Sequence, residues 1–132
     1  MNFAIVDIET TGGHASANGI TEISVFVHDG QRVIKHFETL INPLQPIPGF
    51  ITSLTGIDDA MVANAPAFEE IADELFEILD ENVFVAHNVN FDYSFIKHQL
   101  KQSGYELTSK KLCTVRLGRK VFPGLQSYSL GN

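Results

Sequence analysis

The Asp29-Gly30 turn is the feature that most constrains the fold of this 132-residue chain. It separates residues 20–28, in which apolar and polar side chains alternate, from a second strand-like segment at residues 32–41. Asp-Gly between two such segments is a strong signal for a β-hairpin. An apolar run at residues 3–8 is typical of a further, buried strand. The first third of the chain therefore predicts an antiparallel meander of three strands.

The rest of the chain alternates between helical and strand patterns. We predict helices at residues 50–55, 66–80 and 91–103, strands at 83–86 and 111–115, and further helical segments up to Phe122 and from Ser127. Pro66 suits the first turn of the second helix, and Gly104 suits the end of the third. This order predicts an α/β fold, in which a mixed five-stranded sheet has three antiparallel strands, then parallel strands, and flanking helices.

Charge is divided sharply along the chain. The formal net charge is −7, but residues 1–92 hold fifteen acidic and two basic side chains, whereas residues 93–132 hold one acidic and seven basic ones. This division favours an acidic, cation-binding part beside a basic surface. No apolar run approaches the roughly 20 residues that span a bilayer, and the N-terminus lacks the pattern of a signal peptide, so we expect a cytoplasmic protein that does not enter membranes. Cys113 is expected to be a small buried apolar side chain.

Three acidic residues are set apart by their positions at predicted strand ends. Asp7 and Glu9 lie two residues apart on the first strand and therefore on one face of the sheet. Asp92 follows the apolar strand at residues 83–86, where functional crevices of α/β sheets form. We expect the three carboxylates to make an oxygen-rich site suited to Mg²⁺ or Mn²⁺, with the pKa of at least one raised by repulsion. The alternatives are a strand acid facing water and a helix-start acid favoured by the helix dipole.

Two motifs connect these acids to a known family. DIETTG at residues 7–12 and NxxFDxxFI at residues 88–96 match the first two motifs of the DEDD exonucleases, and residues 53–71 are similar to the connecting segment of the epsilon-like branch. The chain thus resembles DEDDh-type 3′→5′ exonucleases such as the epsilon (proofreading) subunit of bacterial DNA polymerase III. The resemblance implies a ribonuclease H-like fold and hydrolysis of phosphodiester bonds at a single-stranded 3′ end of DNA or RNA.

The resemblance also implies a set of site residues and partners. It assigns Asp7, Glu9 and Asp92 as catalytic ligands of two divalent cations, Mg²⁺ or Mn²⁺. It places Thr10, Thr11 and Gly12 beside the terminal nucleotide, with the glycine allowing backbone to approach phosphate. A DNA polymerase or a fused nuclease domain is the implied protein partner, and DNA replication the implied process.

The sequence departs from the family after Asp92. Family members supply a general base and a fourth carboxylate from a later His-x4-Asp segment, but no aspartate follows Asp92 here, and the later acid and histidine are Glu106 and His98. We therefore expect residues 1–132 to be an exonuclease domain that is incomplete at its C-terminus and nearly inactive by itself. The alternative is a non-catalytic module that binds nucleic acid or a partner and retains the fold.

Other side chains have two interpretations each. His87 is expected to order its loop and not to act as the general base. Phe50 and Leu54 are expected to pack in the core, although apolar side chains of this kind also stack against a terminal base. Five basic residues either contact the nucleic-acid backbone or are scattered surface charge: Lys110, Lys111, Arg116, Arg119 and Lys120.

Overall fold

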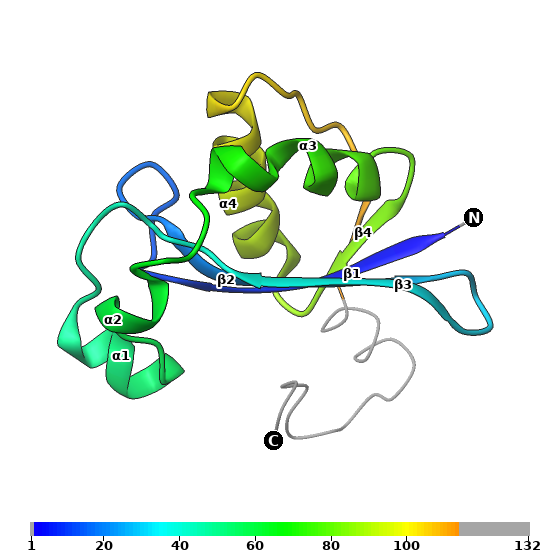
Figure 1. The fold of residues 1–132 in the computed structure, drawn as a ribbon. Coiled ribbons are helices and arrows are strands. Elements are labelled where there is room, and N and C mark those ends of the chain that lie inside the picture. The colour runs from blue at the N-terminus through cyan, green and yellow to red at the C-terminus, as the bar shows by residue number, and fades with distance from the viewer. Residues whose placement is uncertain (1, 114–132) are drawn as a thin grey trace.

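The computed structural model describes residues 2–113 of the chain, which form one sheet with helices packed on it (Figure 1). The strands are β1 (Phe3–Thr10), β2 (Ile20–His28), β3 (Val33–Leu40), β4 (Val83–Ala86) and β5 (Lys111–Cys113). The helices are α1 (Gly49–Thr55), α2 (Asp59–Val62), α3 (Phe68–Leu79) and α4 (Val89–Gln102). Predicted helical segments after residue 115 lie outside the described residues.

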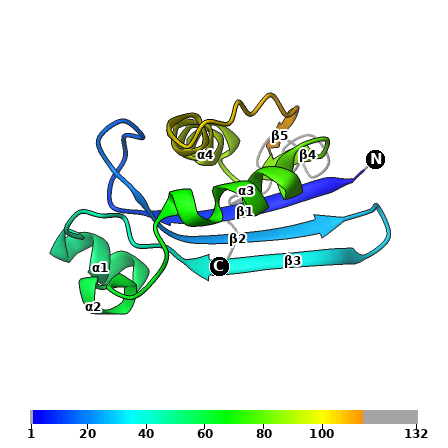
Figure 2. The same cartoon turned by 45° about the horizontal axis from the view of Figure 1, so that its top comes forward.

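The five strands form a single mixed sheet in the order β3-β2-β1-β4-β5. β1, β2 and β3 are antiparallel neighbours, whereas β4 and β5 run parallel to β1. The helices α3 and α4 pack on one face of this sheet, and α1 and α2 lie beyond one end of it (Figures 1 and 2). The predicted α/β class and mixed sheet are confirmed, and β1, which carries Asp7 and Glu9, is the central strand.

The hydrophobic core lies between the sheet and the two long helices. Phe84 of β4, Leu75 of α3 and Ile96 of α4 are fully buried there. The opposite face of the sheet has no helix on it among residues 2–113, and Ile5 and Phe26 are 37% and 39% exposed on that side. We call this the open face. The prediction that β1 is a buried strand is therefore wrong for one of its two faces.

The segment before α3 differs from the prediction. The helix begins at Phe68 and not at residue 66, because the backbone N–H of Asn42 donates to the carbonyl of Pro66 at 2.9 Å and residues 42 and 67 form a parallel bridge. The Glu70 carboxylate then accepts from the backbone N–H of Ala67 at 2.6 Å, which satisfies one of the unpaired donors at the helix start. Gly104 does end α4, with a φ of +92°, as predicted.

The two short helices form a separate unit with its own small core of Ile47, Ile57 and Val62. The sequence pattern does not predict α2, because four residues are too few to show helical periodicity. Asp58 caps this helix, and its carboxylate accepts a hydrogen bond from the backbone N–H of Met61 at 2.9 Å. α1 buries none of its side chains. Within residues 2–113, no helix has the length and apolar character that a membrane span requires.

Candidate active site

The open face carries a group of carboxylates at the centre of the sheet. Asp7 and Glu9 alternate with the buried Val6 and Ile8 along β1, so their side chains leave the strand on the open face. Asp7 is exposed and Glu9 is half-buried. The chain therefore keeps both acids on one face, as predicted, but in contact with solvent rather than inside an apolar layer.

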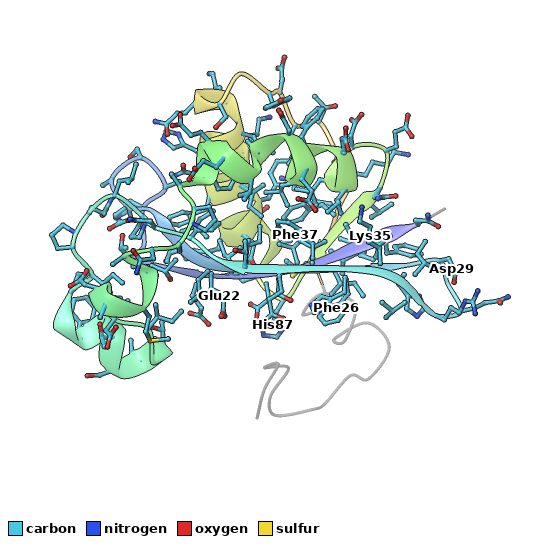
Figure 3. The ribbon with its side chains drawn as sticks, in the orientation of Figure 1. Glu22, Phe26, Asp29, Lys35, Phe37 and His87 are labelled. Carbon is cyan, nitrogen blue, oxygen red and sulfur yellow. The ribbon has the colours of Figure 1, made fainter. Side chains whose placement is uncertain are left out.

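Glu22 of β2 joins this group, although no motif or spacing in the sequence selects it. It is directly opposite Glu9 in the antiparallel register of β1 and β2, and Asp7 is opposite Ser24. Figure 3 shows the Glu22 side chain on the open face, away from α3 and α4. Alternation along β2 predicts the face that Glu22 occupies, but its neighbour on β1 depends on the strand register, which the sequence did not define.

Asp92 approaches the same region from the helical layer. It lies in the first turn of α4 and is 7% exposed. Burial, followed by the negative charge of Asp7, raises the pKa of the Asp92 carboxyl to about 7, and Glu9 adds to this rise; its own backbone N–H and that of Ile8 donate hydrogen bonds that lower it. The Asp92 carboxyl therefore lies within electrostatic range of both acids of β1.

The acids of the open face also perturb one another. Burial, then the charge of Asp7, then that of Glu22 raise the pKa of Glu9. Burial, then Glu38 and Asp7, raise the pKa of Glu22. The expectation that repulsion raises at least one of these pKa values is confirmed for Glu9.

The donor chemistry of this group fits a hard divalent cation. All of the candidate ligands are carboxylates, and none of Asp7, Glu9, Glu22 and Asp92 forms an ion pair with a basic side chain of residues 2–113. In this part of the chain, however, no three acidic, histidine or cysteine side chains converge as a ready-made metal site. Repulsion between unneutralised carboxylates favours rotamers that hold them apart.

A cavity of about 350 Å³ opens beside Glu9, between the end of β1 and helix α1. Phe50 and Leu54 of α1 form part of its wall, together with Phe91 of α4. Phe50 is 67% exposed and Leu54 is 79% exposed, so the expectation that they pack in the core is wrong. α1 presents these two apolar side chains to the cavity because the small core behind it is filled by other residues.

The loop after β1 completes the cavity. Thr10 and Gly12 line it, and the Thr10 hydroxyl donates to the Gly12 carbonyl at 2.8 Å. Thr11 does not line the cavity: it is 1% exposed, and its Oγ1 accepts from the backbone N–H of Gly19 at 3.1 Å. A Cβ on Gly12 would lie 2.5 Å from Oδ1 of Asn18, so any other residue here would require the Asn18 side chain to move.

His87 and Cys113 are linked at the ends of neighbouring parallel strands. The Cys113 thiol donates to the backbone carbonyl of His87 at 3.1 Å, and Cys113 is only partly buried. Figure 3 shows the His87 side chain on the open face of the sheet, on the same side as Glu22. This contact involves the backbone of His87 and not its imidazole, so the role of the side chain in ordering its loop stays a prediction.

The lysines near β5 lie away from the carboxylates of β1. Lys111 is opposite the buried Phe84 and so projects on the helical side, where its Nζ is 3.4 Å from Oδ1 of Asn90 and 4.8 Å from the ring centroid of Tyr93. Lys110 lines a different pocket, with Asp80 among its neighbours. The other three basic residues considered above lie outside the described residues.

Comparison with known proteins identifies the family. A family model described as Exonuclease (RNase_T) matches residues 4–132. The chain belongs to this exonuclease family. This family member is 42% identical to the 3′-5′ exonuclease DinG of Bacillus subtilis (strain 168), over 98% of the chain but 14% of DinG. It is 37% identical to the DNA polymerase III subunit epsilon of Aquifex aeolicus, over 97% of the chain and 64% of that subunit.

Solved exonucleases share the fold of this family member. Exonuclease X in complex with 5′ overhanging duplex DNA has a TM-score of 0.76 and 28% identity, with coverage of 96% of this chain and 68% of that one. Exonuclease I (apo) has a TM-score of 0.82 at 15% identity, over 92% and 30% of the two chains, and so shows the fold alone. The predicted resemblance to epsilon-like exonucleases and the ribonuclease H-like fold are confirmed.

Proposed function

We propose that this exonuclease-family domain, residues 1–132, hydrolyses nucleotides from the 3′ end of a DNA or RNA strand with the help of two divalent cations, Mg²⁺ or Mn²⁺. The observation that carries the proposal is that the buried Asp92 carboxyl lies within electrostatic range of Asp7 and Glu9 of the central strand, beside the cavity that Glu9 lines. Carboxylates without basic partners next to a concave surface suit metal-assisted hydrolysis.

In this proposal Asp7 and Glu9 hold the cations, and Asp92 completes the ligand set from the helical layer. Bound divalent ions would supply an activated water and stabilise the leaving 3′-oxygen. Asp92 has a particular task, because a carboxyl with a pKa of about 7 must lose its proton before it can act as a ligand at neutral pH. We assign no general base among residues 2–113.

The cavity would receive the terminal nucleotide. Phe50 and Leu54 offer apolar surface against which a base can stack, and such contacts are tolerant of sequence. Thr10 and Gly12 would face the sugar and phosphate, whereas Thr11 would act through the loop that it anchors. A volume of about 350 Å³ is at the lower end of the range of small-molecule sites, which suits one nucleotide at the end of a single strand.

The similar proteins suggest the setting. They include a polymerase III epsilon subunit and a PolC-type DNA polymerase III of Caldanaerobacter subterraneus, of which this chain covers 9%. We therefore propose a DNA polymerase or a larger nuclease polypeptide as its partner, with DNA replication in the cytoplasm as the process.

The test is a 5′-labelled single strand, prepared as DNA and as RNA of one sequence, incubated with excess protein and Mn²⁺ so that a low rate is measurable. We expect products that shorten from the 3′ end, lost in Asp7→Asn and retained in Asp73→Asn, which changes an exposed aspartate of α3. Binding of the strand without shortening would instead support a non-catalytic nucleic-acid module. Cleavage independent of metal and of Asp7 would refute the proposed site.

A further inference from the structure

Glu9 and Glu22 form a pair of like charges that the sheet itself does not explain. The register of β1 and β2 places them directly opposite each other on the open face. Opposed residues of antiparallel strands have Cβ atoms about 4.5–5.5 Å apart, and like charges in that arrangement destabilise the sheet. A polar or apolar residue at position 22 would complete β2 without this cost.

The surroundings of Glu22 provide no counter-charge within the described residues. On the neighbouring strand β3, Leu40 lies opposite Glu22. On β2 itself, the next residue on the same face is Ser24. Glu22 is half-buried, and no basic side chain of residues 2–113 forms an ion pair with it. A half-buried carboxylate opposite a second carboxylate is a poor choice for stability alone.

A second observation, from a different layer, points to the same spot. The side chain of Asp92 is more than nine-tenths buried and reaches the acids of β1 from α4, with backbone N–H groups but no basic side chain of the described residues as its partners. Glu9 therefore lies opposite Glu22 of β2 and also within electrostatic range of the buried Asp92. Glu9 also lines the cavity between β1 and α1.

We propose that Glu22 is a positioning residue of this site, whose carboxylate strengthens the binding of divalent cations by Asp7 and Glu9. The inference rests on the proposed function and adds to it a residue from β2. Glu22 would act by adding negative charge and by accepting hydrogen bonds from water on the ion. Loss of an outer hydrogen-bonding partner of a metal site typically weakens metal affinity by about 10–100-fold.

The test measures Mn²⁺ affinity directly, by electron paramagnetic resonance of the free ion, in the 132-residue chain and its variants. We expect Glu22→Gln to weaken Mn²⁺ binding roughly tenfold or more and Glu22→Asp to recover part of the loss, since it restores the charge. Glu74→Gln is the matched control, because Glu74 is an exposed acid of α3, on the other side of the sheet from Glu22. Its affinity should stay within about twofold of the unaltered chain.

Thermal unfolding in EDTA separates this role from a structural one. Glu22→Gln should unfold no lower than the unaltered chain, because it removes repulsion with Glu9. An unchanged Mn²⁺ affinity in Glu22→Gln, while Asp7→Asn loses binding, would overturn this inference and leave the proposed function standing. If the unaltered chain binds no Mn²⁺ at millimolar concentration, the proposed function fails first and the role of Glu22 fails with it.

Discussion

Substitution of Asp92 by asparagine tests the electrostatics of the site without any metal. The pKa of this carboxyl rises from an ordinary value of 3.8 to about 7 in the folded protein. At about 1.36 kcal/mol for each unit, holding the charged form in the fold costs about 4 kcal/mol at high pH. Between the two values the folded protein binds more protons than the unfolded chain does. Asp92 therefore makes the protein lose stability as the pH rises through this window, and the cost disappears below it.

Comparing two pH values removes the contribution that asparagine makes through its own hydrogen bonds. From about pH 5 to about pH 8, the cost of ionising Asp92 grows by roughly 2–3 kcal/mol. Asp92→Asn carries no such charge, so its stability advantage over the unaltered chain should widen by that amount. For a chain of this size the gap in melting temperature should widen by roughly 10 °C.

The assay is thermal unfolding in EDTA at the two pH values, followed by circular dichroism. Asp73→Asn serves as the control, because it removes one acid from an exposed position of α3 and should show no widening gap. If the gap between Asp92→Asn and the unaltered chain is the same at both pH values, the buried carboxyl is not held against ionisation and the reasoning about this site is wrong.

Three further predictions concern the metal, the cavity and the loop. Millimolar Mn²⁺ should raise the melting temperature in a thermal scan. At a concentration one hundred times the Kd, binding adds about 2.7 kcal/mol to the free energy of unfolding. Asp7→Asn should lose most of this increase. Phe50→Ala and Leu54→Ala should weaken binding of a single-stranded oligonucleotide, measured by fluorescence anisotropy. Their melting temperatures should not change, because both side chains are exposed. Met61→Ala, which changes an exposed apolar residue of α2, should alter neither oligonucleotide binding nor the melting temperature. Gly12→Ala should lower the free energy of unfolding, measured in urea, by about 1–3 kcal/mol because of the clash with Asn18. The double variant with Asn18→Ala should recover part of that stability. An equal loss in the single and the double variant would refute the steric explanation.

The strands and the long helices could be predicted because their signals are local. The alternation in residues 20–28 defines both β2 and the face that each side chain occupies, and the apolar segment at residues 83–86 has the bounds of β4. Gly104 marks the end of α4 because the positive φ there favours glycine. The start of α3 could not be predicted in the same way, since it depends on a hydrogen bond between Asn42 and Pro66 from distant parts of the chain.

The residues of the candidate site that could be predicted are likewise those with a local sequence signal. Asp7, Glu9 and Asp92 were selected from spacing and motifs, which are properties of short segments. Glu22 was missed because its importance depends on its partner across β1, and a change of register by one residue would place it on the other face. The exposure of Phe50 and Leu54 was mispredicted because an apolar residue in a helix is usually a core residue, and no local signal shows that α1 packs on a core made by other segments.

The two faces of β1 show how one strand serves both the fold and the site. Val6 and Ile8 point into the core and contribute burial, whereas Asp7 and Glu9 point to the open face, where Asp7 is exposed and Glu9 is half-buried. The core thus fixes the backbone of the acids without enclosing the acids themselves. Asp92 is the exception, because its carboxyl is buried and its pKa is raised to about 7. In the proposed function, the ionisation of Asp92 is therefore the step at which cation binding and stability oppose each other, since binding must offset the cost of ionising a buried carboxyl.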